Sequence, residues 1–362
     1  MLRTFKYRIY PTKIQMNKID ETLYWCRYLY NNALEQRIIA FKKHNVSLSY
    51  NKQANELKHV KAVLPVYKDI YSQVLQDVLK RLDKAYQNFF RRLKTRQENE
   101  KPGFPRFKGM NRYNSFTYPQ SGFTVVGDTL KLSKIGDVRI HLHRKLVGEL
   151  KTCTIIRKNG KYYVALVCEV ENPKITLTNK VVGIDLGVSH LAITSDGEFF
   201  DNPKYLRKSE KQLKKLQRIV SKRKKGSNRR RKAVRLLSKK HEQIANQRKD
   251  TNHKVSRILV DKYDLIVFED LNIKGLVKNK HLAKSIHEVG WNQLINFTTY
   301  KAENAGKEVA LVNPHNTSQL CSNCGEIVKK TLAEREHICR CGYTAHRDIN
   351  ASINILNRGL SA

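Results

Sequence analysis

Val181-Val-Gly-Ile-Asp-Leu-Gly187 is an apolar run that ends in one carboxylate, Asp185. Together with the residues up to Phe199 it predicts a strand, a turn at Ser195-Asp-Gly197 and a second strand. Buried strands are also predicted at Asp264 to Phe268 and Glu308 to Val312, with helices between these segments. The order of strand, hairpin, helices, strand, helix and strand is typical of a mixed α/β sheet.

Two more acidic residues stand where apolar elements end or begin. They are Glu269 in Leu265-Ile-Val-Phe-Glu-Asp-Leu271 and Asp348 in His346-Arg-Asp-Ile-Asn-Ala-Ser352. Gathered carboxylates repel by roughly 4 kcal/mol per pair at 4 Å and an effective dielectric constant of 20, unless cations lie among them. Carboxylate oxygens suit Mg²⁺, and two such ions activate a water and stabilise the leaving oxygen in phosphodiester hydrolysis. We therefore predict that Asp185, Glu269 and Asp348 are catalytic ligands of two Mg²⁺ ions.

Alternative readings of these motifs are weaker. Asp348 also suits a helix cap. A turn similar to Gly183-Ile-Asp-Leu-Gly187 approaches phosphate in sugar kinases and actin-like ATPases, but the sequence lacks a second Gly-rich loop and an adenosine motif. His141-Leu-His143 matches the paired histidines of single-strand transposases, without their acidic or tyrosine context.

The composition points to a nucleic-acid partner. The chain has 362 residues, 40% of them hydrophobic, which is enough for two or three domains with real cores. Its 70 Lys and Arg against 32 Asp and Glu give a net charge of +38, which a polyanion would neutralise. Two basic helices are expected at 205–224 and 229–260, with a phosphate-binding tip formed by Lys222-Arg-Lys-Lys225, Gly226-Ser-Asn and Arg229-Arg-Arg-Lys232.

The sequence lacks the features expected of a membrane protein or a secreted protein. No stretch of about 18 apolar residues exists, so no membrane association is expected. The N-terminus, Met1-Leu-Arg-Thr-Phe-Lys-Tyr-Arg-Ile-Tyr10, alternates like a strand and has no apolar segment of signal-peptide length. We expect a cytoplasmic protein.

The N-terminal half predicts helices followed by short strands. Helical spacing covers Pro11 to about 45, then 49–62 and 70–97. Short alternating runs separated by Gly and Asp turns then predict a small β-barrel, with strands at 114–118, 123–126, 130–132, 138–143, 153–157 and 162–169. If the first strand joins this barrel, the helical domain is an insertion into it. Residues 171–180 are expected to form a linker.

Four of the seven cysteines have metal-site spacing. Cys321-Ser-Asn-Cys324 and Cys339-Arg-Cys341 offer four thiolates for a tetrahedral, structural Zn²⁺. The second pair has one intervening residue instead of two, and His337 is an alternative ligand. The other three cysteines lie singly in apolar contexts and are expected to be small core residues: Cys26, Cys153 and Cys168.

These motifs, in this order, resemble the TnpB family of transposon-encoded RNA-guided DNA endonucleases, relatives of type V CRISPR effectors. The resemblance covers essentially the whole chain. It is carried by Tyr7-Arg-Ile-Tyr-Pro11, Cys26-Arg-Tyr-Leu-Tyr-Asn31, Gly103-Phe-Pro-Arg-Phe-Lys108, Gly183-Ile-Asp-Leu-Gly187, Phe268-Glu-Asp-Leu271, Asn316-Thr-Ser-Gln-Leu-Cys-Ser-Asn-Cys-Gly325 and Arg347-Asp-Ile-Asn-Ala351.

The resemblance implies four parts. They are a wedge-like β-barrel at 1–10 and 103–175, an inserted helical recognition domain at 11–102, an RNase H-like (RuvC) nuclease domain at 180–315 and 344–362, and a zinc-binding segment at 316–343. It also implies cleavage of double-stranded DNA beside a short transposon-adjacent motif, with a guide RNA from the transposon end. A monomer is expected.

Carried over by position, Asp185, Glu269 and Asp348 become the RuvC metal ligands and the four clustered cysteines the zinc ligands. His346 stands where many relatives have an acid. Two other functions stay open at this level: an RNA-guided DNA-binding repressor, whose relatives have lost acids that this chain keeps, and a general nucleic-acid-binding protein without cleavage.

Overall fold

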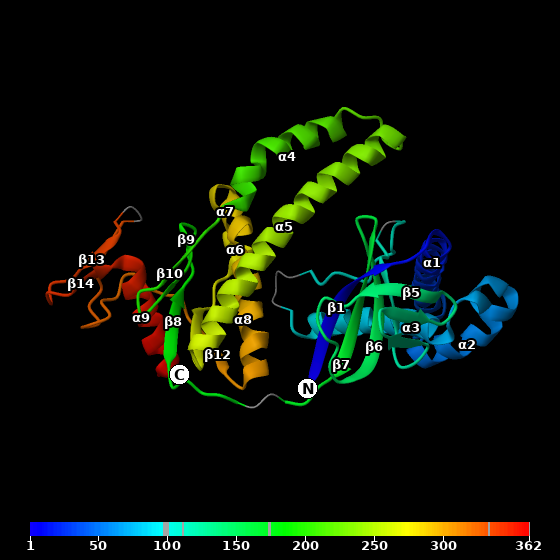
Figure 1. Cartoon of the computed structure of the whole chain (residues 1–362), viewed down its shortest axis with the longest axis horizontal. Coiled ribbons are helices and arrows are strands. Elements are labelled where there is room, and N and C mark those ends of the chain that lie inside the picture. The colour runs from blue at the N-terminus through cyan, green and yellow to red at the C-terminus, as the bar shows by residue number, and fades with distance from the viewer. Residues whose placement is uncertain (97–100, 111, 173–174, 332–333, 362) are drawn as a thin grey trace. The chain divides into compact units, whose positions relative to one another are not determined.

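The computed structural model describes residues 1–96, 101–110, 112–172, 175–331 and 334–361. The expected end of the third helix at 97, part of the expected linker at 173–174, two residues of the expected zinc-binding segment at 332–333, and residue 362 lie outside these ranges. The chain forms two compact units, Met1–Glu171 and Asn172–Ala362 (Figure 1).

The first unit contains a seven-stranded antiparallel sheet. Alternation of polar and apolar residues produces the strands, so that Phe5, Tyr7 and Ile9 of the first strand all face the core. The order across the sheet is β2-β6-β7-β1-β5-β4-β3. The strands are β1 (Leu2–Tyr10), β2 (Ser115–Tyr118), β3 (Phe123–Val126), β4 (Thr129–Leu132), β5 (Gly136–His141), β6 (Glu149–Lys158) and β7 (Lys161–Glu169).

The expectation of a closed barrel is wrong for the described strands. The sheet ends at β2 and β3, which are four residues long and do not pair with each other. Arg81 lies against β2 instead, where its guanidinium donates to Ser115 O at 2.8 Å and to Thr117 Oγ1 at 2.6 Å. A side chain therefore satisfies a backbone carbonyl of this edge strand, a group that another strand would bond in a closed barrel.

Helices between β1 and β2 share one hydrophobic core with the sheet. They are α1 (Lys13–His44), α2 (Tyr50–Val63), the 3-10 helix η1 (Pro65–Asp69) and α3 (Ser72–Lys94). The first begins with a capping box in which Thr12 and Gln15 bond reciprocally to each other's backbone N–H. The helix α3 buries Val74, Val78 and Leu82 against this core.

The second unit contains the expected mixed sheet. Its order is β10-β9-β8-β11-β12, in which β8, β11 and β12 are parallel and β8, β9 and β10 are antiparallel. The strands are β8 (Val181–Asp185), β9 (His190–Thr194), β10 (Phe199–Asp201), β11 (Leu265–Glu269) and β12 (Glu308–Val312). The central strands are almost wholly apolar, as parallel strands covered by helices require.

Helices pack on this sheet and form its core. Val255 and Leu259 of α5 join Trp291 and Leu294 of α8 in one cluster with the buried residues of β8 and β11. The helices are α4 (Tyr205–Ser221), α5 (Asn228–Lys262), α6 (Ile273–Leu276), α7 (Lys280–Val289), α8 (Trp291–Ala305) and α9 (Arg347–Leu360). Between β12 and α9 the chain forms a small ribbon of β13 (Glu336–Ile338) and β14 (Thr344–His346).

The basic helices α4 and α5 form a hairpin (Figure 1). Ser227 caps α5 by accepting from the N–H of Arg230. The guanidinium of Arg230 in turn donates to Val220 O at 2.7 Å and to Arg223 O at 3.1 Å. One arginine of the expected phosphate-binding tip therefore holds the end of α4. No helix in the described ranges has the length and apolar character needed to cross a bilayer.

Two glycines let α9 lie very close to the sheet. A Cβ on Gly183 of β8 would stand 2.1 Å from Ser352 O and 2.6 Å from Leu356 N, both backbone atoms of α9. A Cβ on Gly359 of α9 would stand 2.4 Å from the side chain of Val267 on β11. The contact at Gly183, which is made with backbone atoms, thus fixes how near the middle of α9 comes to β8.

We expect Gly183→Ala to displace α9 and lower the stability of the second unit by about 1–3 kcal/mol, because the new methyl group meets backbone rather than a movable side chain. Differential scanning calorimetry measures this as a fall of roughly 2–4 °C in melting temperature per kcal/mol. Gly109→Ala is the control, since a Cβ there meets nothing within 4 Å. Equal melting temperatures for both variants would contradict the close packing.

Candidate functional site

The three predicted acids come from three elements of the second unit that meet at one edge of the sheet. Asp185 is the last residue of β8 and Glu269 the last of β11. These strands are parallel and in register, with Ile184 opposite Phe268, so the two carboxylates end adjacent strands. Asp348 lies in the first turn of α9, which packs on both strands. Sequence positions more than 160 residues apart are thereby brought together.

The negative charges of Glu269 and Asp348 affect the ionisation of Asp185. Burial, together with the negative charges of Glu269 and Asp348, raises the pKa of Asp185 to about 8, although Arg347 opposes the rise. Burial also raises the pKa of Glu269, against the effect of a hydrogen bond from Thr317. Glu269 is 7% exposed. A carboxyl whose ionisation is disfavoured by two neighbouring acids is part of a donor set that suits divalent cations.

Glu269 and Asp348 each have identified neighbours. The Thr317 hydroxyl donates to Glu269 Oε1 at 2.5 Å. Arg347 Nε lies 3.2 Å from Asp348 Oδ1, and an Arg335 guanidinium nitrogen lies 4.0 Å from Asp348 Oδ2. The predicted cap role of Asp348 belongs to His346 instead, whose Nδ1 accepts from the Asp348 N–H at 3.3 Å. The Asp348 carboxylate is therefore not used to cap its own helix.

The four predicted cysteines form a compact cluster. Their sulfur atoms all lie within 4.8 Å of one another, with 3.8 Å between Cys321 and Cys341 and 3.6 Å between Cys324 and Cys339. Zn–S bonds of about 2.3 Å in a tetrahedron imply sulfur separations of about 3.8 Å, whereas a disulfide needs about 2.05 Å. The spacing therefore fits a closed, four-ligand zinc site.

The short spacing of the second cysteine pair is accommodated by a turn between β13 and β14. Cys339 N–H donates to Tyr343 O, and Gly342 N–H donates to Cys339 O, both at 3.0 Å. The backbone N–H of Tyr343 and the Asn323 side chain lower the pKa of the Cys341 thiol to about 6, which favours a metal-binding thiolate. His337 is fully buried, contacts Lys330, and is not a member of the sulfur cluster.

Within the ranges that the structure describes, the cysteines are the only group of three or more Cys, His, Asp or Glu side chains whose ligand atoms lie close enough together to hold one metal ion. The three carboxylates are therefore spaced more widely than the sulfur atoms.

Sequence reasoning missed three polar residues that link the two sites. Thr317 is 5% exposed and bonds to Glu269. Asn350 and Asn354 of α9 are 0% and 7% exposed, and their amides donate to carbonyls of the loop that leads to the first cysteine pair. Two asparagines four residues apart on the otherwise apolar face of a helix were the available signal, because buried amides need partners.

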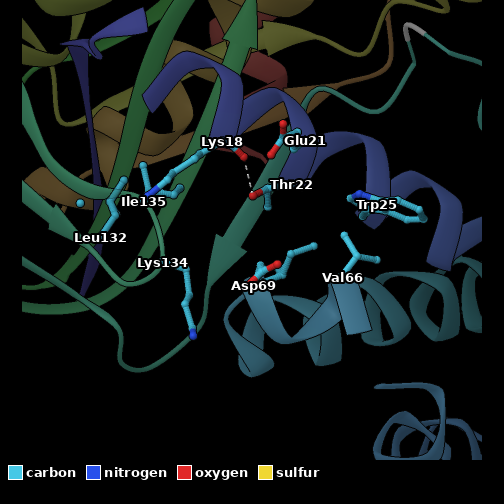
Figure 2. A pocket seen from close by; sticks show the side chains of 11 residues that line it. Lys18, Glu21, Thr22, Trp25, Val66, Asp69, Leu132, Lys134 and Ile135 are labelled. Atoms are coloured by element: carbon cyan, nitrogen blue, oxygen red, sulfur yellow. Dashed lines mark hydrogen bonds between the residues drawn. The ribbon is translucent and has the colours of Figure 1, made fainter. Parts of the chain in front are cut away.

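The first unit has its own concavity, but its chemistry is different. A cavity of about 600 Å³ lies among α1, η1 and the β4–β5 turn (Figure 2). Lys18 and Lys134 in its wall are balanced by Glu21 and Asp69, so neither phosphate nor a cation is favoured.

The paired histidines of the same unit, His141 and His143, lie with ring centroids 6.2 Å apart, and His143 packs on Tyr7.

Family comparisons cover most of the chain. A model described as a probable transposase of the OrfB_IS605 type matches residues 165–280, and one described as a Cas12f1-like TNB domain matches residues 291–355. A helix-turn-helix model of the first family matches residues 1–45, which here form a strand and a single long helix.

Two curated relatives match over 99% of the chain. A putative RNA-guided DNA endonuclease of Streptomyces pristinaespiralis is 35% identical, with 90% of its length covered. The putative RNA-guided DNA endonuclease InsQ of Escherichia coli K12 is 32% identical, with 92% covered. Among solved structures, a Cas12f1 complex with guide RNA and target DNA aligns over 99% of both chains with a TM-score of 0.64 and 13% identity, a likeness of fold.

Proposed function

Because this chain belongs to the TnpB family of IS605-type transposons, we propose that it is an RNA-guided, magnesium-dependent endonuclease that cleaves double-stranded DNA beside a short transposon-adjacent motif. The family membership supports an enzyme of the endodeoxyribonuclease class, as its relatives are named. The observation that carries the proposal is the meeting of Asp185, Glu269 and Asp348 at one edge of the mixed sheet.

The chemistry of the donor set suits Mg²⁺. Asp185, Glu269 and Asp348 would hold two such ions, which supply an activated water and neutralise charge on the leaving oxygen. The protein's own residues prepare this site: Thr317 orients Glu269, and His346 fixes the first turn of α9. Arg347 offsets part of the negative charge of the acids.

The cysteine cluster would hold one structural Zn²⁺ through Cys321, Cys324, Cys339 and Cys341. We assign the zinc-binding segment to residues 316–343 and the RuvC-like nuclease to 180–315 and 344–362. We assign the wedge-like part to residues 1–10 and 103–175 and the recognition helices to 11–102. A monomer is the proposed working form.

Basic residues on α4 support a nucleic-acid partner. Five cations recur every three or four residues and so share one helix face: Lys208, Lys211, Lys215, Arg218 and Lys222. They line a hollow of about 740 Å³. Successive charges are about 5 Å apart along the helix axis, so this face offers a row of cations to phosphate groups. Guide RNA and target DNA are the proposed polyanions, as in the Cas12f1 complex named above.

The test is the RNA that copurifies with the full chain. We expect one defined, long species whose variable end can be exchanged to redirect cleavage to a matching DNA duplex, in Mg²⁺ but not in EDTA. Heterogeneous RNA without cleavage would contradict guidance and favour a general nucleic-acid-binding protein. Defined RNA with guided binding but no cutting in Mg²⁺ would favour the repressor.

A further inference from the structure

The carboxylate of Glu269 is held by a residue from outside the sheet. Its Oε1 accepts from the hydroxyl of Thr317, which lies in the loop after β12. That hydroxyl is also 3.2 Å from Pro314 O, but it has one hydrogen, and the shorter bond to the charged acceptor is the stronger. Both side chains are nearly inaccessible to solvent. Water therefore has little access to Glu269 and does not readily replace the threonine hydroxyl there.

The loop that carries Thr317 is fixed by the helix that carries Asp348. Asn354 Nδ2 donates to Thr317 O at 2.9 Å and to Leu320 O at 2.7 Å. Asn350 Nδ2 also donates to Leu320 O, and its Oδ1 accepts from Ser322 N–H at 2.9 Å. These bonds continue into the first cysteine pair. The position of the threonine hydroxyl is therefore set jointly by α9 and by the cysteine segment.

We propose that Thr317 is a positioning residue that holds the Glu269 carboxylate in the orientation needed to bind divalent metal. This inference rests on the proposed nuclease function. A carboxylate with free rotation about its side-chain bonds must lose that freedom when it binds a metal. A fixed hydrogen bond removes this cost beforehand and leaves Oε2 and the second lone pair of Oε1 for the cation. A purely structural Thr317 would affect folding stability but not metal affinity.

The variants Thr317→Val and Thr317→Ser separate these roles. Valine keeps the shape and removes the donor, whereas serine keeps the donor and removes a methyl group. The full chain with its copurified RNA is titrated with Mn²⁺ and the free ion is measured by electron paramagnetic resonance. Cleavage of a guide-matched duplex is measured in parallel against Mg²⁺ concentration.

We expect Thr317→Val to weaken Mn²⁺ binding and to raise the Mg²⁺ concentration for half-maximal cleavage by about 10–100-fold, the range for loss of a residue that orients a metal ligand. Thr317→Ser should stay within about twofold of the parent on both readouts, since it restores the hydrogen bond. Part of the lost rate should return at high Mg²⁺, because the three metal ligands remain.

Equal metal affinity of the valine variant and the parent would overturn the inference, as would equal defects in the valine and serine variants. If Thr317→Val does not fold, Thr317→Ala, which adds no bulk, is measured in its place against the same serine control. If the parent chain itself shows no divalent-dependent cleavage, the proposed function fails; if the parent cuts and the valine variant matches it, only the role of Thr317 fails.

Discussion

Replacing Asp185 with alanine is expected to abolish DNA cleavage while guide RNA and target DNA binding stay nearly unchanged. The residue ends β8 beside Glu269, and the negative charges of both partner acids raise its pKa, so it lies in the shared field of the site. Its removal takes away a metal ligand without touching the basic faces of α4 and α5. Metal stabilisation of developing charge contributes several kcal/mol, so the cleavage rate should fall by roughly 10³-fold or more.

Single-turnover cleavage and equilibrium binding of the same guide-loaded protein measure the two quantities. Asp201→Ala is the matched control, because Asp201 is an exposed acid of the same sheet, on β10. That variant should cut at the parental rate. Loss of target binding in proportion to loss of cutting by Asp185→Ala would contradict a role in metal binding, and so would retained cutting.

The same variant should be more stable than the parent when EDTA removes divalent ions. The folded protein raises the pKa of Asp185 to about 8, from an ordinary value of 3.8, so the folded state favours the protonated form. The stability that this proton contributes is present below about pH 4 and is lost as the pH rises through about 8. The difference in melting temperature between Asp185→Ala and the parent should therefore increase in favour of the variant as the pH rises from about 4 to about 8.

Replacing Cys321 with serine is expected to release zinc and unfold the cysteine segment while both hydrophobic cores stay folded. No described residue of 313–346 belongs to a hydrophobic core cluster, and the two strands of the ribbon have three residues each. A segment this small depends on its metal, since structural zinc contributes about 10–16 kcal/mol of apparent binding energy to zinc-finger peptides. Loss of the segment should also slow cleavage, because the loop from Thr317 to Ser322 connects it to Glu269.

Metal analysis by mass spectrometry and amide hydrogen exchange measure this outcome. We expect zinc to be lost and exchange to become fast over 316–346, while α5, α8 and the mixed sheet remain protected. Ser322→Ala is the control, since it changes a neighbour of the ligand and keeps all four thiols. A Cys321→Ser protein with full zinc content and unchanged exchange in this segment would refute the structural metal site.

The sequence predicted the mixed sheet because strong local patterns define its elements. Glu308–Val312 was predicted with the bounds that the strand has, and Val181–Asp185 is followed by the expected hairpin. Apolar strands that end in acids also indicated which residues would meet, because the carboxyl ends of parallel strands share one edge. The role of each acid as a ligand stays a prediction.

Features that depend on tertiary contacts could not be predicted from the sequence. The barrel was wrong because closure depends on pairing of the edge strands, and Arg81 lies against one of them instead. The part played by Thr317 could not be predicted because its partner is 48 positions away. The helix α7 and the ribbon β13–β14 were missed because they are short: α7 has ten residues, and the strands have three each.

The α4–α5 hairpin has a mechanical consequence. With 35 residues, α5 is about 52 Å long, which equals roughly 15 base pairs of duplex at 3.4 Å each. One end is embedded beside the sheet through Val255 and Leu259, and Arg230 stiffens the other by bonding across the tip. The length of α5 therefore matches a defined length of nucleic acid. A double helix lying along α5 would contact the protein over more than one full turn, at a fixed distance from Asp185, Glu269 and Asp348.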